Sequence, residues 1–327
     1  MSIAGLAVAF VVAAVAIALL RRTPVAVRLA DRPNERSLHH IPTPRVGGLG
    51  LLAGALPVAW IFSTLEGAWI MAVATVLAAV SVVDDARNLP IALRLACHFA
   101  AASAAVAVLS SGNGGQAAMT IFPMIVAALA IAWMANLFNF MDGADGLAGG
   151  MAAIGFAALS LASHRAGAPD VAMTSGALSA ASVAFLGFNF PPARIFLGDA
   201  GSVPLGFLAG ALGWQGVVRG LWPAWFPLLV FSPFVVDASV TLAFRLVSRE
   251  PVWRAHRSHY YQRLILGGWS HRRLALHAWA LMAATCASAL LAREGPDLLQ
   301  RGIIILWVVA FGALAVGIDR RHPRRIP

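Results

Sequence analysis

Eleven apolar runs follow one another along the chain, separated by short polar segments. A helix needs about 20 mostly apolar residues to cross a bilayer. Runs of about that length lie at 2–20, 46–64, 67–83, 91–110, 118–139, 146–163, 171–190, 201–217, 223–246, 273–292 and 302–318. The pattern predicts an all-α polytopic membrane protein with about 11 transmembrane helices, formed by one integral membrane domain over residues 1–327.

Composition supports a membrane protein and leaves no room for a large soluble domain. Hydrophobic side chains make up 60% of the 327 residues and charged ones 12%, whereas about a quarter of the residues in soluble domains are charged. The mean hydropathy is +0.78. The only two cysteines, Cys97 and Cys286, lie in apolar stretches, which excludes a disulfide scaffold.

The net charge of +10 becomes informative once the basic residues are placed along the chain. No basic residue precedes the first run, so we expect a retained helix with its N-terminus outside and, after eleven crossings, a cytoplasmic C-terminus. In that orientation 20 of the 24 arginines fall on the cytoplasmic side and 4 on the outer side. Arginine favours cytoplasmic loops, so the positive charge requires no nucleic acid partner.

Acidic and amide side chains gather at the ends of spans that face the predicted cytoplasmic side. Asp84 and Asp85 close the third span. Asn136, Asn139, Asp142 and Asp145 recur at every third residue at the end of the fifth span, a spacing that places helical neighbours near one face. Asp199 lies in a short Gly-rich loop between spans seven and eight.

Carboxylates crowded at a low-dielectric boundary ionise together only when a cation joins them. Ligand sets made of oxygen favour a hard ion, and Mg²⁺ typically combines one or two carboxylates with substrate phosphates. The acidic residues therefore predict a Mg²⁺-assisted reaction of a phosphate compound, with Mn²⁺ as an alternative ion. We expect the chemistry in five cytoplasmic loops, at 21–45, 84–90, 140–146, 191–202 and 247–272.

Two of these loops are rich in Arg and His. The loop after the first span carries Arg36, His39 and Arg45, and the longest cytoplasmic loop carries His256, Arg257 and His259. Arginine and histidine donors suit anionic ligands such as phosphate oxygens. A stretch of positive-inside loop without a ligand is the simpler alternative for the first of these loops.

Five motifs in order resemble the bacterial polyprenyl-phosphate N-acetylhexosamine-1-phosphate transferases. They are the stretch from Asp31 to Gly48, then Asp84 with Asp85, the segment from Asn139 to Leu147, the segment from Leu197 to Ser202, and the loop with His256 and His259. The resemblance implies a Mg²⁺-dependent enzyme of the bacterial inner membrane with its active site on the cytoplasmic face. Such an enzyme moves a sugar 1-phosphate from a UDP-N-acetylhexosamine to undecaprenyl phosphate and releases UMP.

The resemblance also assigns roles to the residues. It implies that Asp199, with Asp142, binds the metal, and that Asp84 and Asp85 assist the metal or the lipid phosphate. His256 completes the expected catalytic set. The expected substrate-binding residues are Arg36, His39, Arg45, Asn136, Asn139, Asp145, Arg257 and His259.

Within the family, the chain is most similar to the branch that initiates O-antigen, enterobacterial-antigen and teichoic-acid lipids. His256 and His259 are separated and the chain has no lysine, whereas the phospho-MurNAc-pentapeptide translocase branch has a triple-histidine run and lysines in its loops. That translocase stays an alternative, as does an ion-coupled secondary transporter, although transporters usually place their ionisable groups near the midplane. The donor sugar stays open, and so does the oligomeric state, including a homodimer.

Overall fold

The computed structural model describes residues 2–31, 41–111, 121–251 and 256–324. Almost all of the regular structure in these ranges is helical, with one short antiparallel pair of β1 (Ala30–Asp31) and β2 (Thr43–Pro44). The helices are α1 (Ile3–Leu20), α2 (Pro24–Arg28), α3 (Gly47–Phe62), α4 (Leu65–Arg87), α5 (Ile91–Ser111), α6 (Ile121–Phe140), α7 (Leu147–Arg165), α8 (Pro169–Asn189), α9 (Asp199–Val218), α10 (Trp225–Val230), α11 (Ser232–Val247), α12 (Tyr260–Leu266), α13 (His271–Ala292) and α14 (Asp297–Arg321). The predicted all-α polytopic fold is confirmed.

Within the described ranges, nine helices are long and apolar enough to cross a membrane. The apolar run at 46–64 forms the shorter helix α3, with 16 residues. The prediction of one helix over 223–246 is wrong, because this run divides at Phe231 into α10 and α11. Pro233 lies in the first turn of α11, where its missing N–H and fixed φ favour the start of a helix and disfavour an uninterrupted one.

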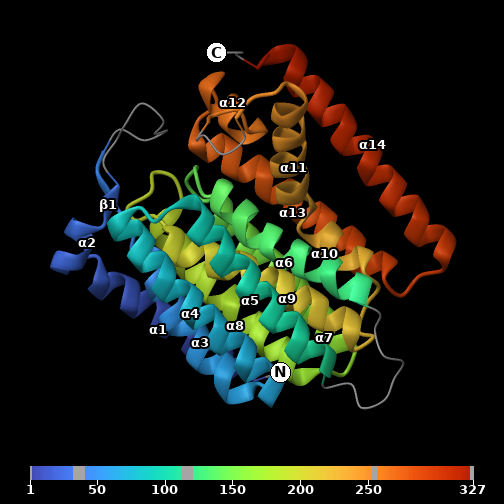
Figure 1. Cartoon of the computed structure of the whole chain (residues 1–327), viewed down its shortest axis with the longest axis horizontal. Coiled ribbons are helices and arrows are strands. Elements are labelled where there is room, and N and C mark those ends of the chain that lie inside the picture. The colour runs from blue at the N-terminus through green and yellow to red at the C-terminus, as the bar shows by residue number, and fades with distance from the viewer. Residues whose placement is uncertain (1, 32–40, 112–120, 252–255, 325–327) are drawn as a thin grey trace.

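The core of the bundle is formed by α7, α8 and α9. In the most apolar stretch of α7 and of α9, 78% of the residues are buried inside the protein, compared with 6% in α14. Figure 1 shows α14 set apart along one side of the bundle, with the other helices packed around α8 and α9. The most buried part of the molecule is therefore central, and α14 is peripheral.

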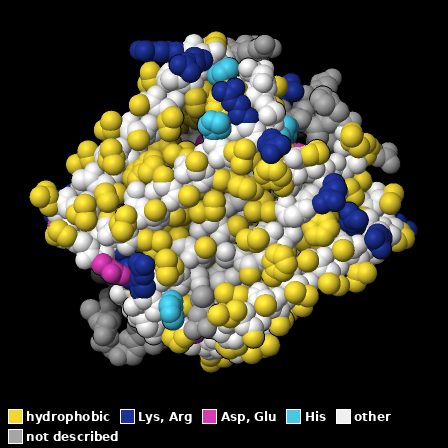
Figure 2. All heavy atoms as spheres, turned by 180° about the vertical axis from the view of Figure 1, so that it is seen from behind, with side chains coloured by type: hydrophobic (Ala, Val, Ile, Leu, Met, Phe, Trp, Pro, Cys, Tyr) yellow, Lys and Arg dark blue, Asp and Glu magenta, His cyan; other side chains and the backbone are white. Residues whose placement is uncertain are grey.

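Large apolar side chains cover the outside of the bundle. Ile305, Val308 and Val309 of α14 are each more than 60% exposed, at 63%, 67% and 63%. Figure 2 shows hydrophobic side chains over most of one face, with arginines gathered toward its edges. Extensive apolar exposure on helices is what a lipid environment requires. The ends of the chain lie at opposite ends of the molecule (Figure 1), while the predicted N-outside orientation stays a prediction.

Candidate active site

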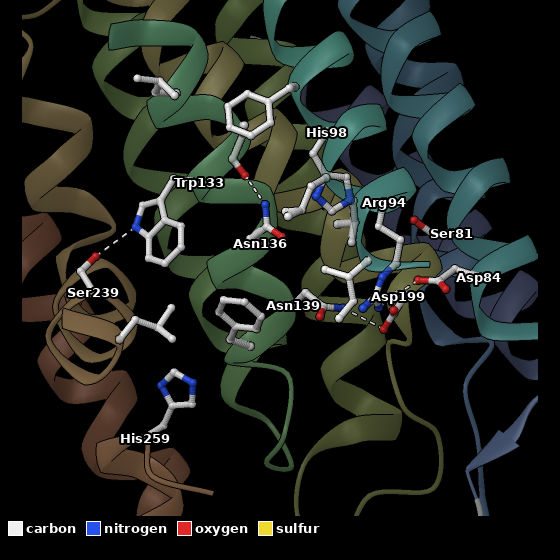
Figure 3. A pocket seen from close by; sticks show the side chains of 18 of the residues that line it. Ser81, Asp84, Arg94, His98, Trp133, Asn136, Asn139, Asp199, Ser239 and His259 are labelled. Carbon is white, nitrogen blue, oxygen red and sulfur yellow. Dashed lines mark hydrogen bonds and ion pairs between the residues drawn. The ribbon is translucent and has the colours of Figure 1, made fainter. Parts of the chain in front are cut away.

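A cavity of about 1020 Å³ opens between α4, α5, α6, α9 and α11 (Figure 3). One side, the acid wall, is formed by Asp84, Arg94, Asn139 and Asp199. The opposite side, the histidine wall, is formed by His256, His259 and Gln262. The two walls thus bring together residues that are up to 178 positions apart in the chain, counted from Asp84 to Gln262.

Apolar side chains line the rest of the cavity. Leu95 of α5, Leu129 of α6 and Leu246 of α11 contribute to this lining, and they are 39%, 50% and 67% exposed. These exposed leucines give the cavity an apolar flank. A polar end and an apolar flank therefore share one continuous space.

Asp84 is held at the end of α4 by two contacts. Its Oδ1 accepts a hydrogen bond of 2.7 Å from the Leu89 backbone N–H, and its Oδ2 lies 3.2 Å from Nη1 of Arg94. The first contact requires the chain to reverse after α4, which Asn88 achieves with a left-handed backbone (φ 51°). The Arg94 guanidinium consequently stands beside the carboxylate inside the cavity.

Asp199 begins α9 and faces the end of α6. The Asn139 side-chain amide donates to Oδ1 of Asp199 at 2.7 Å and to Oγ of Ser202 at 3.1 Å. These contacts fix the orientation of both side chains. Asn136 lies one turn deeper in the cavity, where its amide donates to the Ala132 carbonyl.

The position of Asp199 depends on close packing of the loop before α9 against the start of α3. The Gly47 and Gly48 N–H groups donate to the carbonyls of Phe196 and Leu197, both at 2.9 Å. A Cβ on Gly48 would overlap the backbone of Gly201 in α9. Only glycine allows this approach, so the Gly47/Gly48 pair in the sequence serves to bring α3 and α9 together.

Two more carboxylates lie next to Asp199. Asp85 accepts a hydrogen bond of 3.3 Å from the Ala200 N–H, and its other oxygen lies 3.9 Å from Arg45, which also pairs with Asp31 at 2.7 Å. Burial, followed by the charge of Asp199, raises the pKa of Asp142 well above its ordinary value. The structure thus gathers carboxyl groups around Asp199, with Arg45 and Arg94 as nearby cations.

The two histidines of the opposite wall lie together. The ring centroids of His256 and His259 are 4.9 Å apart, and Oγ of Ser258 lies 2.7 Å from Nδ1 of His256. Burial, with the nearby charges of His259 and Arg245, lowers the pKa of His256 to about 4. His256 is therefore neutral near pH 7 and can act as a hydrogen-bonding group there.

Asp237 of α11 holds the histidine wall in place through hydrogen bonds. Its Oδ1 accepts from the Tyr260 N–H at 2.9 Å and lies 3.2 Å from Nδ1 of His259, while its Oδ2 accepts from the Tyr261 N–H at 3.0 Å. A carboxylate at this position also complements the positive end of the helix dipole of α12. Because Nδ1 of His259 faces Asp237, its Nε2 is left for a ligand.

Tyr261 joins the histidine wall to the loop that carries Asp142. Its hydroxyl donates to the Phe140 carbonyl at 3.0 Å, and a Cβ on Gly143 would overlap that hydroxyl. Burial, with the charge of Asp237, raises the pKa of Tyr261, so the hydroxyl keeps its proton and stays a donor.

Not all residues expected from the sequence meet at this site. Asp145 lies elsewhere, where it accepts from the Ala193 N–H and pairs with His271, and Arg257 is exposed and outside the cavity lining. The expectation of one shared helix edge holds for Asn136 and Asn139 but is wrong for Asp142 and Asp145, because α6 ends at Phe140 and the chain turns before Asp142. Arg36 and His39 lie outside the described residues.

Three site residues were not predicted to belong to it. Arg94 and Gln262 line the cavity, and Asp237 holds its histidine wall. The sequence did carry a signal for Arg94 and Asp237, since ionisable residues inside apolar spans usually have a functional partner. Gln262 carries no comparable signal.

Comparison with known proteins identifies the family of this chain. The profile of glycosyl transferase family 4 matches residues 68–216. A decaprenyl-phosphate N-acetylglucosaminephosphotransferase of Mycolicibacterium smegmatis is 30% identical over 89% of this chain and 82% of its own length. The chain belongs to glycosyl transferase family 4.

Two further relatives are named as two different kinds of transferase. A probable undecaprenyl-phosphate N-acetylglucosaminyl 1-phosphate transferase of Bacillus subtilis is 25% identical over 94% of this chain and 90% of its own length. A phospho-N-acetylmuramoyl-pentapeptide-transferase of Desulforudis audaxviator is 30% identical over 84% of this chain and 91% of its own length. All three relatives are named as transferases, so the transporter alternative is set aside.

Proposed function

We propose that this protein transfers an N-acetylhexosamine 1-phosphate from a UDP-sugar to undecaprenyl phosphate at the cytoplasmic face of the bacterial inner membrane. The products are UMP and a lipid-diphosphate-linked sugar, the first unit of a cell-surface polysaccharide of the O-antigen type. The observation that carries the proposal is the single cavity that joins the charged side chains of the acid wall to an apolar flank of exposed leucines. A nucleotide-sugar and a lipid phosphate need both surfaces at once.

In the proposed reaction an oxygen of the lipid phosphate attacks the β-phosphorus of the UDP-sugar. A new P–O bond forms to the lipid phosphate while the anhydride bond to the α-phosphate breaks, and UMP leaves with the electron pair. Little covalent chemistry falls to the protein, so its contribution is positioning and charge neutralisation. Arg94, oriented by Asp84, lies where the apolar flank meets the acid wall and would bind the lipid phosphate.

A magnesium ion fits the donor set around Asp199. The described residues contain no group of three or more His, Cys, Asp or Glu side chains arranged to hold a metal. Mg²⁺ needs only one or two carboxylates when substrate phosphates supply further oxygens, and Asp199 with Asp142 would provide them. When bound, the ion would neutralise charge on the diphosphate.

The remaining residues would hold the donor. Asn139 fixes Asp199, and Asp85 with Arg45 balances the charge beside it. His259, with Nδ1 directed to Asp237, and neutral His256 would hydrogen-bond the sugar or its phosphates from the opposite wall. Arg257 is exposed and directly follows His256 in the chain. It would contact the donor only after the donor has entered the cavity.

The test is a lipid-dependent release of UMP. Purified protein in detergent is incubated with undecaprenyl phosphate, Mg²⁺ and a panel of UDP-N-acetylsugars that includes UDP-MurNAc-pentapeptide. Release of UMP with formation of a lipid-linked sugar, only when the lipid is present, supports the proposal and identifies the donor. Turnover of the pentapeptide donor alone would reassign the protein to peptidoglycan synthesis, and silence with every donor in folded protein would refute the transferase.

A further inference from the structure

The end of the peripheral helix α14 contacts the short helix α12, which begins directly after His259 of the histidine wall. In Figure 1 the C-terminal end of α14 lies beside α12, and residues of the two helices are in contact. We call the contacts of Asp319, His322 and Arg324 with α12 and α11 the C-terminal clamp. None of these three residues belongs to the acid wall or lines the cavity.

Arg263 of α12 is the centre of the clamp. Its side chain is 5% exposed, and its Nη1 lies 2.7 Å from Oδ1 of Asp319. The same guanidinium donates through Nε and Nη2 to the His322 carbonyl. A buried guanidinium that loses its carboxylate partner becomes costly, so Asp319 and His322 help to hold Arg263, and with it α12, in place.

A second cation, Arg324, adds contacts to the C-terminal clamp. Arg324 donates to the Tyr260 hydroxyl at 3.0 Å and lies 3.7 Å over the ring of Phe244 in α11. Tyr260 is the first residue of α12 and directly follows His259. The clamp therefore contacts the helix that begins directly after His259 of the histidine wall.

The clamp matters more because α14 has few other attachments. Only Phe311 is buried along the whole helix. A helix that buries so few side chains along its length is attached to the rest of the protein mainly at its ends. The polar contacts with Arg263 and Tyr260 are the principal attachment at the C-terminal end.

We propose that Asp319 is a positioning residue for the donor-binding histidines, acting through Arg263 and α12. The proposal rests on the proposed transferase function for its kinetic consequence. Loss of the Asp319 carboxylate would let α12 shift, so that His256 and His259 would hold the donor less well while the acid wall stays intact. The expected signature is a higher KM for the UDP-sugar with little change in kcat.

The test compares Asp319→Asn with the conservative Asp319→Glu and the control Asp297→Asn, which removes an exposed carboxylate from the other end of α14. For Asp319→Asn we expect a rise of about 5- to 20-fold in KM for the UDP-sugar and faster hydrogen exchange of the amides at 260–266, as loss of a partly buried ion pair allows. Asp319→Glu and Asp297→Asn should stay within about twofold of wild type on both measures.

Each outcome decides the matter. Asp319→Asn behaving like Asp297→Asn in both measurements would overturn the proposal, as would faster exchange with an unchanged KM, which would make the clamp purely structural. Should Asp319→Asn fail to fold, Arg324→Gln removes the clamp's contact with Tyr260 and should raise the KM and the exchange rates in the same direction. If wild type transfers no sugar, the transferase function fails, while the exchange measurement still shows whether Asp319 holds α12.

Discussion

The acid wall stands on α4, α5, α6 and α9, and glycines let α9 pack closely against α3 and α6, whereas the histidine wall lies at the start of α12, a helix of seven residues. Asp199 is fixed by its place at the start of a core helix and by Asn139. His259 is fixed by Asp237, a side chain 22 positions away in the sequence. One wall is thus held by the main fold, and the other by individual side-chain contacts.

This difference predicts two kinds of mutational effect. Substitutions of the acid wall's charged groups should remove chemistry and leave the fold, since the scaffold does not depend on them. Substitutions behind the histidine wall should weaken substrate binding even where the changed residue never touches substrate. Four experiments, ordered from the largest expected effect, test the distinction.

Asp199→Asn should reduce kcat by about 10³-fold or more, because it removes a full charge from the proposed metal site while Asn139 can still pair with the amide. Thermal stability should stay close to that of wild type. UMP release measured with and without EDTA, and after Mg²⁺ is restored, shows whether the metal acts through this residue. Glu66→Gln, at the opposite end of α4, is the matched control and should retain activity.

Gly48→Ala should destabilise the protein by about 1–3 kcal/mol, because the added methyl group meets the backbone of α9 rather than a flexible side chain. Activity should fall with it, since Asp199 begins that helix. Thermal unfolding in detergent measures the change. Gly187→Ala is the control, because a Cβ there meets nothing within 4 Å, and equal stabilities for the two variants would refute the packing argument.

Asp237→Asn should lower kcat/KM by about 10-fold, mostly through KM, since one amide oxygen cannot replace a carboxylate that accepts from two N–H groups and His259. Asp237→Glu should recover part of the loss. Steady-state kinetics with varied UDP-sugar separates KM from kcat. A fall in kcat alone would mean that Asp237 affects the chemical step, as the acid wall does. That result would contradict the proposed difference between the two walls.

The smallest effect concerns pH. The folded pKa of His256, about 4, lies below its usual value of 6.5, so the unfolded chain takes up the proton first as pH falls. His256 therefore favours folding above pH 6.5 and loses that contribution as pH falls toward about 4. In His256→Gln, thermal stability should decline less over this window than in wild type, and identical declines would contradict the lowered pKa. Asp237, His259 and Arg245 surround this group and remain in both proteins.

The sequence predicted much of the acid wall because its residues belong to short motifs at the ends of apolar runs. Once Asp84, Asn139 and Asp199 are assigned to span ends on one side, helix geometry alone brings them near one another. The same reasoning failed for Asp145, since a helical spacing says nothing after the helix has ended at Phe140. The break between α10 and α11 likewise depends on Pro233, which apolar content does not register.

The histidine wall was only half predictable. His256 and His259 were recognised as neighbours on one loop, but their supports, Asp237 and the α14 end, come from distant parts of the chain. Such contacts follow from how helices pack, and no local spacing encodes them. The role of Arg94 was not predictable from the sequence for a related reason. Its contact with Asp84 depends on the turn at Asn88 between α4 and α5.

The exposed leucines at the side of the cavity have a kinetic consequence. An acceptor that enters past Leu95, Leu129 and Leu246 arrives from within the bilayer, by diffusion in two dimensions. Its effective concentration is then its mole fraction in the surrounding lipid or micelle, not its amount per litre. Diluting the acceptor with inert detergent at constant total amount should slow the reaction, while the water-soluble donor would be insensitive to the same dilution.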